Sequence, residues 1–544
     1  MATVAAPTTS VRELTVRGVI LGALITVLFT AANVYLGLRI GITFATSIPA
    51  AVISMAILRF FQGATIQENN IVQTIASAAG TLSAIIFVLP GLVMVGWWTG
   101  FPFWLSVAVI AIGGILGVMY SVPLRRALVT GSDLPYPEGV AAAEVLKVGA
   151  GVGGAEENQR GLIAIVISSL VSAGYAILAQ TRIFAADVAK TFKFGAGATT
   201  VSTGMSMALI GVGHLVGLGV GIAMLVGMIV SWFVLVPWQT DLAGVGALTD
   251  HAAIETLVSD TFRQKVRFIG AGTIGVAAIW TLVKIIGPII KGIMSALAAN
   301  RARRAGQGEG LPLTERDLPI TIVGGTIIAS MIPIWLLLAA SGQSGPIADA
   351  TGSTLIVTIV YILFAGVVIA AVCGYMAGLI GASNSPISGV GILAVLGISL
   401  ILAAMFPAVD ATATQSLVAF ALFVTAIVFG IATISNDNLQ DLKTGQLVHA
   451  TPWRQQVALV LGVIFGAVVI PPILTLLNDA FGFQGAPGAG PNALAAPQAA
   501  LISAIAQGVL GGDLDWNLIA LGAAIGVGII CIDELLRATK RGSL

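Results

Sequence analysis

The densest group of polar side chains lies in SNDNLQDLKTGQLVHATPWRQQ, residues 435–456, directly after a long apolar run. Asp437 and Asp441 are four positions apart, so on a helix both carboxylates would face the same side. Two neighbouring carboxylates repel each other when both are ionised, and this favours the uptake and release of a proton. Lys443 could neutralise one of them and leave the other to titrate. A solvated loop is the alternative interpretation.

A second polar group, QENNIVQ, occupies residues 67–73 and leads straight into another apolar run. Glu68 would lie at a helix N-terminus, where the helix dipole favours an anion. Asn70 and Gln73 would be about one turn apart and would share a helix face. The alternative is a capped junction between a loop and a helix.

A third group follows Asn33 along NVYLGLRIGITFATSIPA. Tyr35 and Arg39 lie beside glycines, and Pro49 removes a backbone donor and so frees a carbonyl. A charged side chain at the bilayer centre costs at least about 2.5–3.5 kcal/mol, so polar groups at this depth need a reason. The alternative is an interfacial turn with Arg39 extended toward the lipid headgroups.

Two further segments interrupt apolar sequence with proline. In residues 131–149, Pro135 and Pro137 exclude a helix until Glu138, which would begin one. Residues 374–391, GYMAGLIGASNSPISGVG, contain five glycines and a proline. That composition predicts a broken helix whose free backbone groups line a cavity. Ordered or plain connecting loops are the alternatives.

The composition of the whole chain places these groups in a membrane. Hydrophobic residues make up 57% of the 544 residues and charged residues 9%, against about 25% charged in a soluble domain. The net charge of +1 argues against a nucleic-acid partner. The two cysteines indicate neither a disulfide framework nor a metal site, and no cofactor is expected.

A transmembrane helix needs about 20 mostly apolar residues. On that criterion the sequence predicts an all-α polytopic membrane protein with fourteen spans. Two shorter apolar pieces, near 373–386 and 500–510, would be re-entrant segments or half-helices and would raise the count to sixteen. The fourteen spans are predicted near 16–38, 42–60, 71–96, 101–120, 161–180, 195–213, 216–236, 268–290, 318–340, 353–372, 387–405, 415–435, 455–475 and 515–532.

The distribution of Lys and Arg predicts that both termini face the cytoplasm, in the inner membrane of the cell. The expected organisation is a cytoplasmic N-terminal tail (1–15), a first transmembrane half (16–290), a cytoplasmic linker (291–317), a second transmembrane half (318–535) and a cytoplasmic C-terminal tail (536–544). Arg182, Lys190 and Lys193 disagree, because they would fall outside. Either a span there is miscounted or that segment lies on the membrane as an amphipathic piece.

A weak internal similarity raises the question of a two-half repeat. YLGLRIG at 35–41 resembles YMAGLIG at 375–381, and ENNIVQ at 68–73 resembles NDNLQ at 436–440. The predicted topology puts Tyr35 and Tyr375 on opposite sides of the membrane. Coincidence between low-complexity apolar segments is the alternative explanation.

Five strings together resemble the oligopeptide transporter family, in its prokaryotic members: NVYLGLRIGITFATSIPAAVI, ENNIVQTIASAAGTLSAI, LPYPEGVAAAEVLK, GYMAGLIGASNSPISGVGI and ISNDNLQDLKTGQLVHATPWRQQ. The last is similar to a segment of the yellow stripe-like metal-chelate branch, and the likeness runs from about residue 15 to 535. The resemblance implies a helical fold of up to sixteen spans and proton-coupled uptake of small peptides or metal chelates. Further signature strings of the peptide branch are missing, which puts a tetrapeptide cargo in doubt.

The polar segments supply the candidate site residues of such a transporter. The cargo-binding candidates are Asn33, Tyr35, Arg39, Gln67, Asn69, Asn70, Gln73, Tyr136, Asn384, Ser385, Asn436, Asn438 and Gln440. The proton-coupling candidates are Asp437 and Asp441 first, then Glu68, and also Glu138. The expected partners are the cargo, protons and the lipid bilayer, and a homodimer is compatible with the sequence.

Other function classes have less support. The sequence has no G-x-x-x-x-G-K-[ST] loop for ATP-driven transport. It has neither H-E-x-x-H nor G-x-S-x-G, although the Asp437 and Asp441 pair leaves an intramembrane enzyme as an alternative. A channel lined by broken helices is the other alternative.

Overall fold

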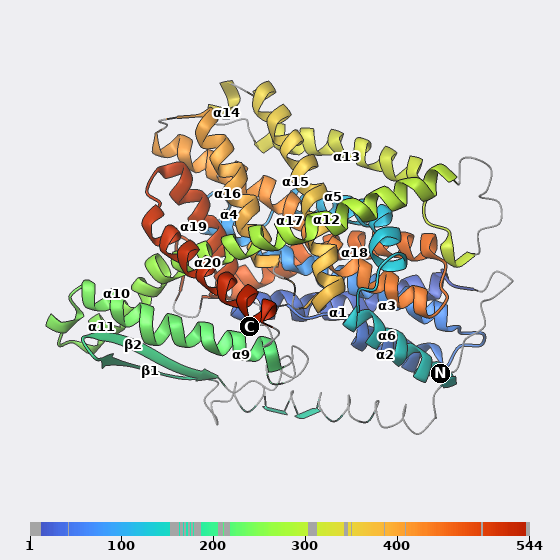
Figure 1. Cartoon of the computed structure of the whole chain (residues 1–544), viewed down its shortest axis with the longest axis horizontal. Helices are drawn as coiled ribbons and strands as arrows, with labels where there is room; N and C mark the ends of the chain where they lie inside the picture. Colours follow the sequence, from blue (N-terminus) through green and yellow to red (C-terminus); the bar gives the residue numbers. More distant parts are fainter. Residues whose placement is uncertain are drawn as a thin grey trace. The chain divides into compact units, whose positions relative to one another are not determined.

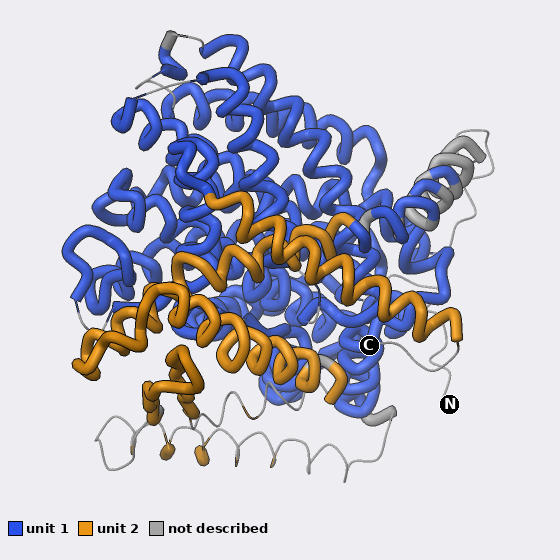
Figure 2. The backbone as a smooth tube through the Cα atoms, turned by 60° about the vertical axis from the view of Figure 1, so that its left-hand side comes forward, with its two compact units in different colours: residues 1–155, 280–514 blue, residues 156–279, 515–544 orange. Residues whose placement is uncertain are grey.

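In the computed structural model of the chain, the described residues are 12–41, 43–152, seven positions between 163 and 178, 187–204, 210, 218–302, 313–341, 346–349, 351–383, 385, 387–407, 410–490 and 493–539. The chain divides into two compact units (Figure 2). Unit 1 comprises residues 1–155 and 280–514, and unit 2 comprises residues 156–279 and 515–544. This division does not fall at 291–317, and the two transmembrane halves stay a prediction.

The described secondary structure of unit 1 is helical (Figure 1), apart from an isolated β-bridge between Phe483 and Leu494. Its helices are α1 (Val16–Ile40), α2 (Ser47–Leu58), α3 (Ile66–Leu82), α4 (Pro90–Met94), α5 (Phe103–Leu124), α6 (Pro137–Lys147), α13 (Ile320–Ser341), α14 (Pro346–Asp349), α15 (Thr351–Ile380), α16 (Ile387–Met405), α17 (Ala411–Leu447), α18 (Pro452–Phe481) and α19 (Pro497–Gly511). Short turns η1 (Ser83–Phe87), η2 (Arg125–Thr130), η3 (Val148–Val152) and η8 (Leu313–Glu315) join them.

Helix α17 forms the centre of unit 1. It begins at an Asp410 cap, whose carboxylate accepts from the amide of Ala413 at 2.7 Å. Every residue from Ser416 to Leu442 is buried, because α3, α5, α6, α15 and α16 all pack against it. A helix that is enclosed on all sides can carry polar side chains in every direction, which matters for the site.

Unit 2 contains α9 (Leu218–Ile229), α10 (Val236–Leu242), α11 (His251–Thr261) and α20 (Trp516–Ala538), with turns η4 (Val230–Leu235), η5 (Val245–Ala247) and η6 (Phe262–Val266). Helix α12 (Arg267–Ala302) begins in unit 2 and ends in unit 1. Strands β1 (Asp187–Phe194) and β2 (Gly197–Gly204) form an antiparallel hairpin.

The hairpin shows that the predicted span at 195–213 is wrong at its start. Gly195 adopts a left-handed φ of 61° in the two-residue turn that joins the strands, as tight hairpins require. Four of the eight residues of β2 are β-branched, in GATTVSTG, and such side chains favour a pleated strand. Lys190 and Lys193 lie on β1, whereas Arg182 lies outside the described residues.

Ten helical segments in the described part of the chain are long and apolar enough to cross a membrane. The chain is therefore a polytopic α-helical membrane protein, and the count of fourteen to sixteen spans stays a prediction. The span predicted at 161–180 lies largely outside the described residues.

Two of the predicted boundaries are wrong. Helix α2 has only 12 residues, about 18 Å in length, and is too short for the span expected at 42–60. Residues 373–380 do not form a separate half-helix, because they continue α15 without a break as far as Ile380. The short helix expected near 500–510 is present as α19.

Candidate functional site

Helices α3 and α17 face each other through polar side chains. Ser77 and Thr81 of α3 both donate to the Oδ2 atom of Asp437, at 2.6 and 2.8 Å. Gln73, one turn earlier on α3, donates through Nε2 to Oδ1 of Asp441 at 2.5 Å. Asp437 and Asp441 therefore lie on one face of α17, as their spacing predicts.

The Asp441 carboxylate has fewer hydrogen-bond donors than the Asp437 carboxylate. Oδ2 of Asp441 is buried and has no hydrogen-bond partner among the described residues, and the same is true of Oε1 of Gln73. Both polar atoms of the Asn70 side chain, about one turn before Gln73 on α3, are also buried without a described partner. Buried polar atoms nearly always have partners, so this group can receive a proton, a water molecule or cargo.

Lys443 does not neutralise either carboxylate, so this part of the prediction is wrong. Its Nζ donates to Oε1 of Gln446 at 3.1 Å and lies 5.8 Å from the centre of the Tyr136 ring. Two residues of helix correspond to a rotation of about 200°, so Lys443 points away from Asp441. No described cation forms an ion pair with Asp437 or Asp441.

Helix α6 covers the same stretch of α17. The Gly139 amide donates to Oε1 of Gln440 at 2.7 Å, and a Cβ atom at Gly139 would lie 2.5 Å from the Gln440 carbonyl oxygen. Only glycine allows the two helices to approach this closely. Oε1 of Glu138 accepts from the Ser383 amide at 3.0 Å, and its Oε2 is buried without a described partner.

The segment between α15 and α16 interrupts the helical structure, as the sequence predicts. Helix α15 ends at Ile380, and Gly381 follows with a φ of 94°. Asn436 donates through Nδ2 to the Ala382 carbonyl at 2.9 Å. Asn436 lies eleven residues before the end of α17, about 16 Å along its axis. The break is therefore recessed from that end of the helix.

The remaining predicted polar residues of α17 point to other neighbours. Asn438 donates through Nδ2 to Oγ of Ser121 on α5, at 3.0 Å, and Gln440 donates to the Ala377 carbonyl on α15, at 2.6 Å. Oδ1 of Asn436 and Oδ1 of Asn438 lack described partners. These amide side chains belong to the same stretch of α17 as Asp437 and Asp441, but they face other neighbouring segments.

Tyr136 is a structural support of this region. It adopts a left-handed φ of 44° and is fully buried. Its hydroxyl donates to the Leu128 carbonyl at 2.9 Å and its amide to the Gly378 carbonyl at 2.9 Å. Burial raises the pKa of the Tyr136 phenol well above its usual range, so the hydroxyl keeps its proton and this donor role.

Glu68 lies at the start of α3 and belongs to a separate group. Arg17 holds it by hydrogen bonds of 2.7 and 2.6 Å to both carboxylate oxygens, and Thr15 donates to it at 2.5 Å. The helix N-terminus expected at Glu68 is confirmed, because the Thr65 side chain caps it. The arginine makes Glu68 a weaker candidate for proton exchange than Asp441.

Other residues in the predicted cargo set are hydrogen-bonded to groups outside the carboxylate pair. Asn69 accepts from Ser54 at 2.7 Å, and Gln67 donates to the Val448 carbonyl at 3.0 Å. Asn33 donates to the carbonyls of Phe44 and Gly80, at 3.1 and 3.2 Å.

Tyr35 and Arg39 are hydrogen-bonded to each other at 3.1 Å, with Arg39 exposed. They are not joined to the carboxylate pair by any described contact. Ser385 has a buried hydroxyl without a described partner, and Asn384 lies outside the described residues.

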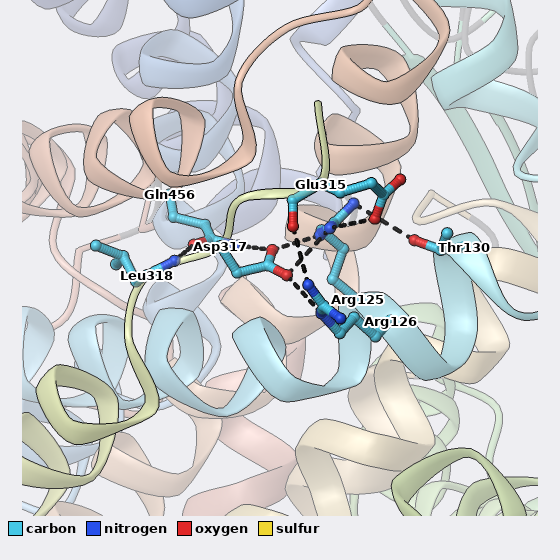
Figure 3. Close-up of polar contacts among 7 residues, drawn as sticks. All are labelled: Arg125, Arg126, Thr130, Glu315, Asp317, Leu318 and Gln456. Carbon is cyan, nitrogen blue, oxygen red and sulfur yellow. Dashed lines mark hydrogen bonds and ion pairs between the residues drawn. The ribbon is translucent and has the colours of Figure 1, made fainter. Parts of the chain in front are cut away.

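A buried ion-pair network at the end of α5 was not predicted from the sequence (Figure 3). Arg125, whose side chain is 1% exposed, donates to Asp317 at 2.5 and 3.0 Å. Arg126 reaches the same carboxylate at 2.9 Å, and Gln456 of α18 donates to it at 2.8 Å. The adjacent arginines in LRRAL were the available signal, since two charges beside an apolar span need a partner.

A second missed contact joins the start of the chain to the turn between α17 and α18. Glu13 is buried and accepts from both the amide and the hydroxyl of Thr451, at 2.9 and 2.7 Å. Its carboxylate also lies 3.4 Å from Arg454.

No group of three or more potential metal ligands occurs among the described residues.

Comparisons with known proteins agree with this architecture. A family model described as OPT oligopeptide transporter protein matches residues 13–544. The chain is 45% identical over 518 residues to a Haemophilus influenzae protein named "Putative oligopeptide transporter", covering 92% of this chain and 80% of that protein.

More distant relatives come from rice, Oryza sativa subsp. japonica. Two proteins named "Probable metal-nicotianamine transporter" are 24% identical over 523 residues and 22% identical over 534 residues. These alignments cover 86% and 89% of this chain, and 71% and 72% of the rice proteins. The family model matches almost the whole length of the chain. The chain therefore belongs to the OPT oligopeptide transporter family, and it is a membrane transporter and not an enzyme.

Proposed function

We propose that the protein is a secondary transporter that couples proton movement to the uptake of small peptides or peptide-like metal chelates. The observation that carries this proposal is the pair Asp437 and Asp441, buried in the last third of α17 with no described cationic partner. An ionised carboxylate without a cation is costly inside a bilayer. A proton removes that cost, so a change in hydration or cargo occupancy can drive its uptake or release.

The groups around the pair suit a cargo with amide bonds. Asn70, Gln73 and Asn436 each keep at least one buried polar atom without a described partner. Amide side chains both donate and accept hydrogen bonds, which matches the backbone of a small peptide. The same amides can bind the carboxylates and amines of a chelate, so the two cargo classes share this chemistry.

The expected location is the inner membrane, with both termini in the cytoplasm. The positive charges of the N-terminal flank, the linker 291–317 and the C-terminus support this orientation. Protons would then enter the cell together with the cargo.

Uptake into proteoliposomes tests the proposal. The purified protein would be reconstituted and offered a panel of radiolabelled peptides and metal chelates, with and without an imposed pH gradient, acidic outside. Saturable uptake that rises with the gradient supports a proton-coupled carrier. Uptake that never saturates indicates a channel, and saturable uptake that ignores the pH gradient contradicts proton coupling. Empty liposomes are the control for passive entry.

A further inference from the structure

Helices α1 and α15 end in the same way. In each, the helix is followed by a glycine in the left-handed conformation, Gly41 with a φ of 76° and Gly381 with a φ of 94°. The Gly41 amide donates to the Gly37 carbonyl at 2.9 Å, and the Gly381 amide donates to the Ala377 carbonyl at 2.8 Å. The next helices, α2 and α16, begin six residues after each glycine, at Ser47 and Ile387.

Each of these ends is contacted by a short helix with the same unusual start. Tyr136 and Ala496 have left-handed φ values of 44° and 37°, and each directly precedes the proline that begins α6 or α19. A left-handed conformation is uncommon for residues other than glycine. The Tyr136 amide donates to Gly378 at 2.9 Å, and the Ala496 amide donates to Leu38 at 2.8 Å. Gly378 and Leu38 both lie three residues before the helix-ending glycine.

The packing partners repeat as well. Helix α3 packs against α1, α2 and α18, and α17 packs against α15, α16 and α5. Helix α6 packs on α2, and α19 packs on α16; Figure 1 labels all of these helices. The pairs α3–α17 and α5–α18 also pack together. The segments α1–α6 and α15–α19 are therefore two copies of one arrangement within unit 1.

The two copies are inverted relative to each other. Gln73 contacts Asp441 and Ser77 contacts Asp437, so residue numbers rise along α3 as they fall along α17. Corresponding helices of the two copies are thus antiparallel. Inverted repeats place corresponding loops at opposite faces of a membrane, in agreement with the opposite sides predicted for Tyr35 and Tyr375.

We propose that α6 and α19 are corresponding gates that close the transport path toward opposite faces of the membrane. The second residue of each helix, Glu138 or Gln498, is the gate residue that lies against the end of α15 or α1. A Cβ atom at Gly381 would lie 2.9 Å from Oε1 of Glu138, and one at Gly41 would lie 3.6 Å from Cγ of Gln498. Opening on either side then requires α6 or α19 to separate from its glycine, and α6 must also leave its contact with Gln440.

The two gates differ in charge, since Glu138 is acidic and Gln498 is neutral, and the carboxylate pair of α17 is not duplicated either. A Cβ at Gly113 would contact the Ile427 carbonyl, and a Cβ at Gly462 would contact the Ile75 carbonyl, which matches Ile427 with Ile75. Ten residues further along each copy, Asp437 therefore corresponds to Ile85, which lies in η1 just after α3. The acidic α6 gate contacts α17 at Gln440, the residue before Asp441, so we expect proton exchange with the site at this gate.

Sided labelling tests the position of the gates. Both native cysteines, the buried Cys373 and the exposed Cys531, would be replaced by alanine and serine. Single cysteines at Glu138 and Gln498 would then be exposed to a membrane-impermeant maleimide in right-side-out and inside-out vesicles. We expect Glu138→Cys to react from one face and Gln498→Cys from the other.

Exposed positions in the loops that lead into α6 and α19 provide matched face markers. Asp133→Cys and Ala489→Cys should react from opposite faces whether or not the gates open. Reaction of both markers from the same face would overturn the inverted arrangement and the proposal with it. The readout needs neither cargo nor a proton gradient, so it stays interpretable if the proposed coupling fails.

Cross-linking tests gating itself. A hydrogen bond of 3.0 Å joins the Ser383 amide to Oε1 of Glu138, so cysteines at positions 138 and 383 lie on facing segments, and loss of free thiols on oxidation would report a disulfide that holds α6 closed. We expect oxidation to abolish transport, reduction to restore it, and oxidation to accelerate modification of a third cysteine at Gln498. The cysteine-less parent controls for effects of the oxidant. Slower or unchanged modification at position 498 would show that the two helices do not alternate.

Discussion

At the scale of single residues, the two carboxylate groups of α17 have different surroundings. Two hydroxyl donors saturate one oxygen of Asp437, whereas Asp441 accepts one amide donor and keeps a buried oxygen without a described partner. A buried acceptor that lacks a donor costs free energy, and a proton on that oxygen would relieve part of the cost. We therefore expect protonation of Asp441 to affect the proposed proton-coupled transport more than protonation of Asp437.

Replacement of this residue gives the first prediction. Asp441→Asn should reduce pH-driven uptake to the level without a gradient, because an amide cannot release a proton. Exchange of cargo down its own gradient should largely remain, because the side chain keeps its shape. Asp479→Asn, at an exposed position of α18, is the matched control. The measurement is uptake with and without a pH gradient, on protein that elutes as a single gel-filtration peak.

The same experiment covers the other candidates. If Asp437→Asn, Asp441→Asn and Glu68→Gln all retain normal gradient-driven uptake, the coupling site lies elsewhere. Loss of uptake in Glu68→Gln alone would instead assign coupling to the Arg17 and Glu68 pair at the start of α3.

The buried network around Asp317 gives the second prediction, also at the residue scale. Asp317→Asn leaves Arg125 and Arg126 without their shared carboxylate. Breaking a buried ion pair on one side typically costs about 3–5 kcal/mol. We expect a clear fall in the thermal unfolding midpoint in detergent, whereas the exposed control Asp513→Asn should unfold like the wild type. Equal midpoints for the two variants would mean that the network adds no stability.

At the scale of elements, the site depends on close approach between helices. Helix α17 is enclosed on all sides, and glycines let its neighbours reach its backbone. Gly139 of α6 is one such point, because it brings the α6 backbone against Gln440. Packed interiors have few voids, so an added methyl group forces a shift of the helix.

This contact gives the third prediction. Gly139→Ala should displace α6 and strongly reduce transport, because the added Cβ would lie 2.5 Å from the Gln440 carbonyl oxygen. Gly324→Ala on α13 is the matched control, since a Cβ there would have no atom within 4 Å. Initial uptake rates normalised to the amount of protein in the membrane would be compared. Full activity of Gly139→Ala would show that α6 can move at no cost to transport.

At the scale of the whole molecule, the number of membrane crossings decides on which face each terminus lies. An even number places both termini on the same face, and an odd number places them on opposite faces. The described residues include ten helices that could cross a membrane, and shorter helices such as α2 and α19 do not reach across one. The hairpin at 187–204 also removes the start of one expected span. The positive charges near both ends still favour one common face.

The fourth prediction follows from those charges. Tags fused to the two ends of the chain should both be accessible from the cytoplasmic face. Protease protection of each tag in inside-out vesicles measures this, and detergent-treated vesicles serve as the control for tag integrity. Tags on opposite faces would require an odd number of crossings and would overturn the proposed orientation.

The sequence by itself determined the class of the protein and most of its long helices. Apolar runs of sufficient length need internally paired backbone in lipid, so α5, α13 and α16 lie close to their predicted positions. Local spacing also placed Asp437 and Asp441 on one helix face. It failed at 197–204 because an apolar, glycine-rich segment satisfies a hydropathy window whether it forms a helix or a strand.

Only the tertiary structure decided which polar groups meet. Ser77 and Asp437 are 360 positions apart in the chain, and no local pattern links them. The sequence pointed to Lys443 as the neighbour of the carboxylates, but helix rotation turned that side chain toward Tyr136. Asn33, which the sequence assigned to cargo, holds the Phe44 turn, and its role in cargo binding stays a prediction. A polar residue in an apolar run can satisfy its own helix end or a distant partner, and only packing settles which of these occurs.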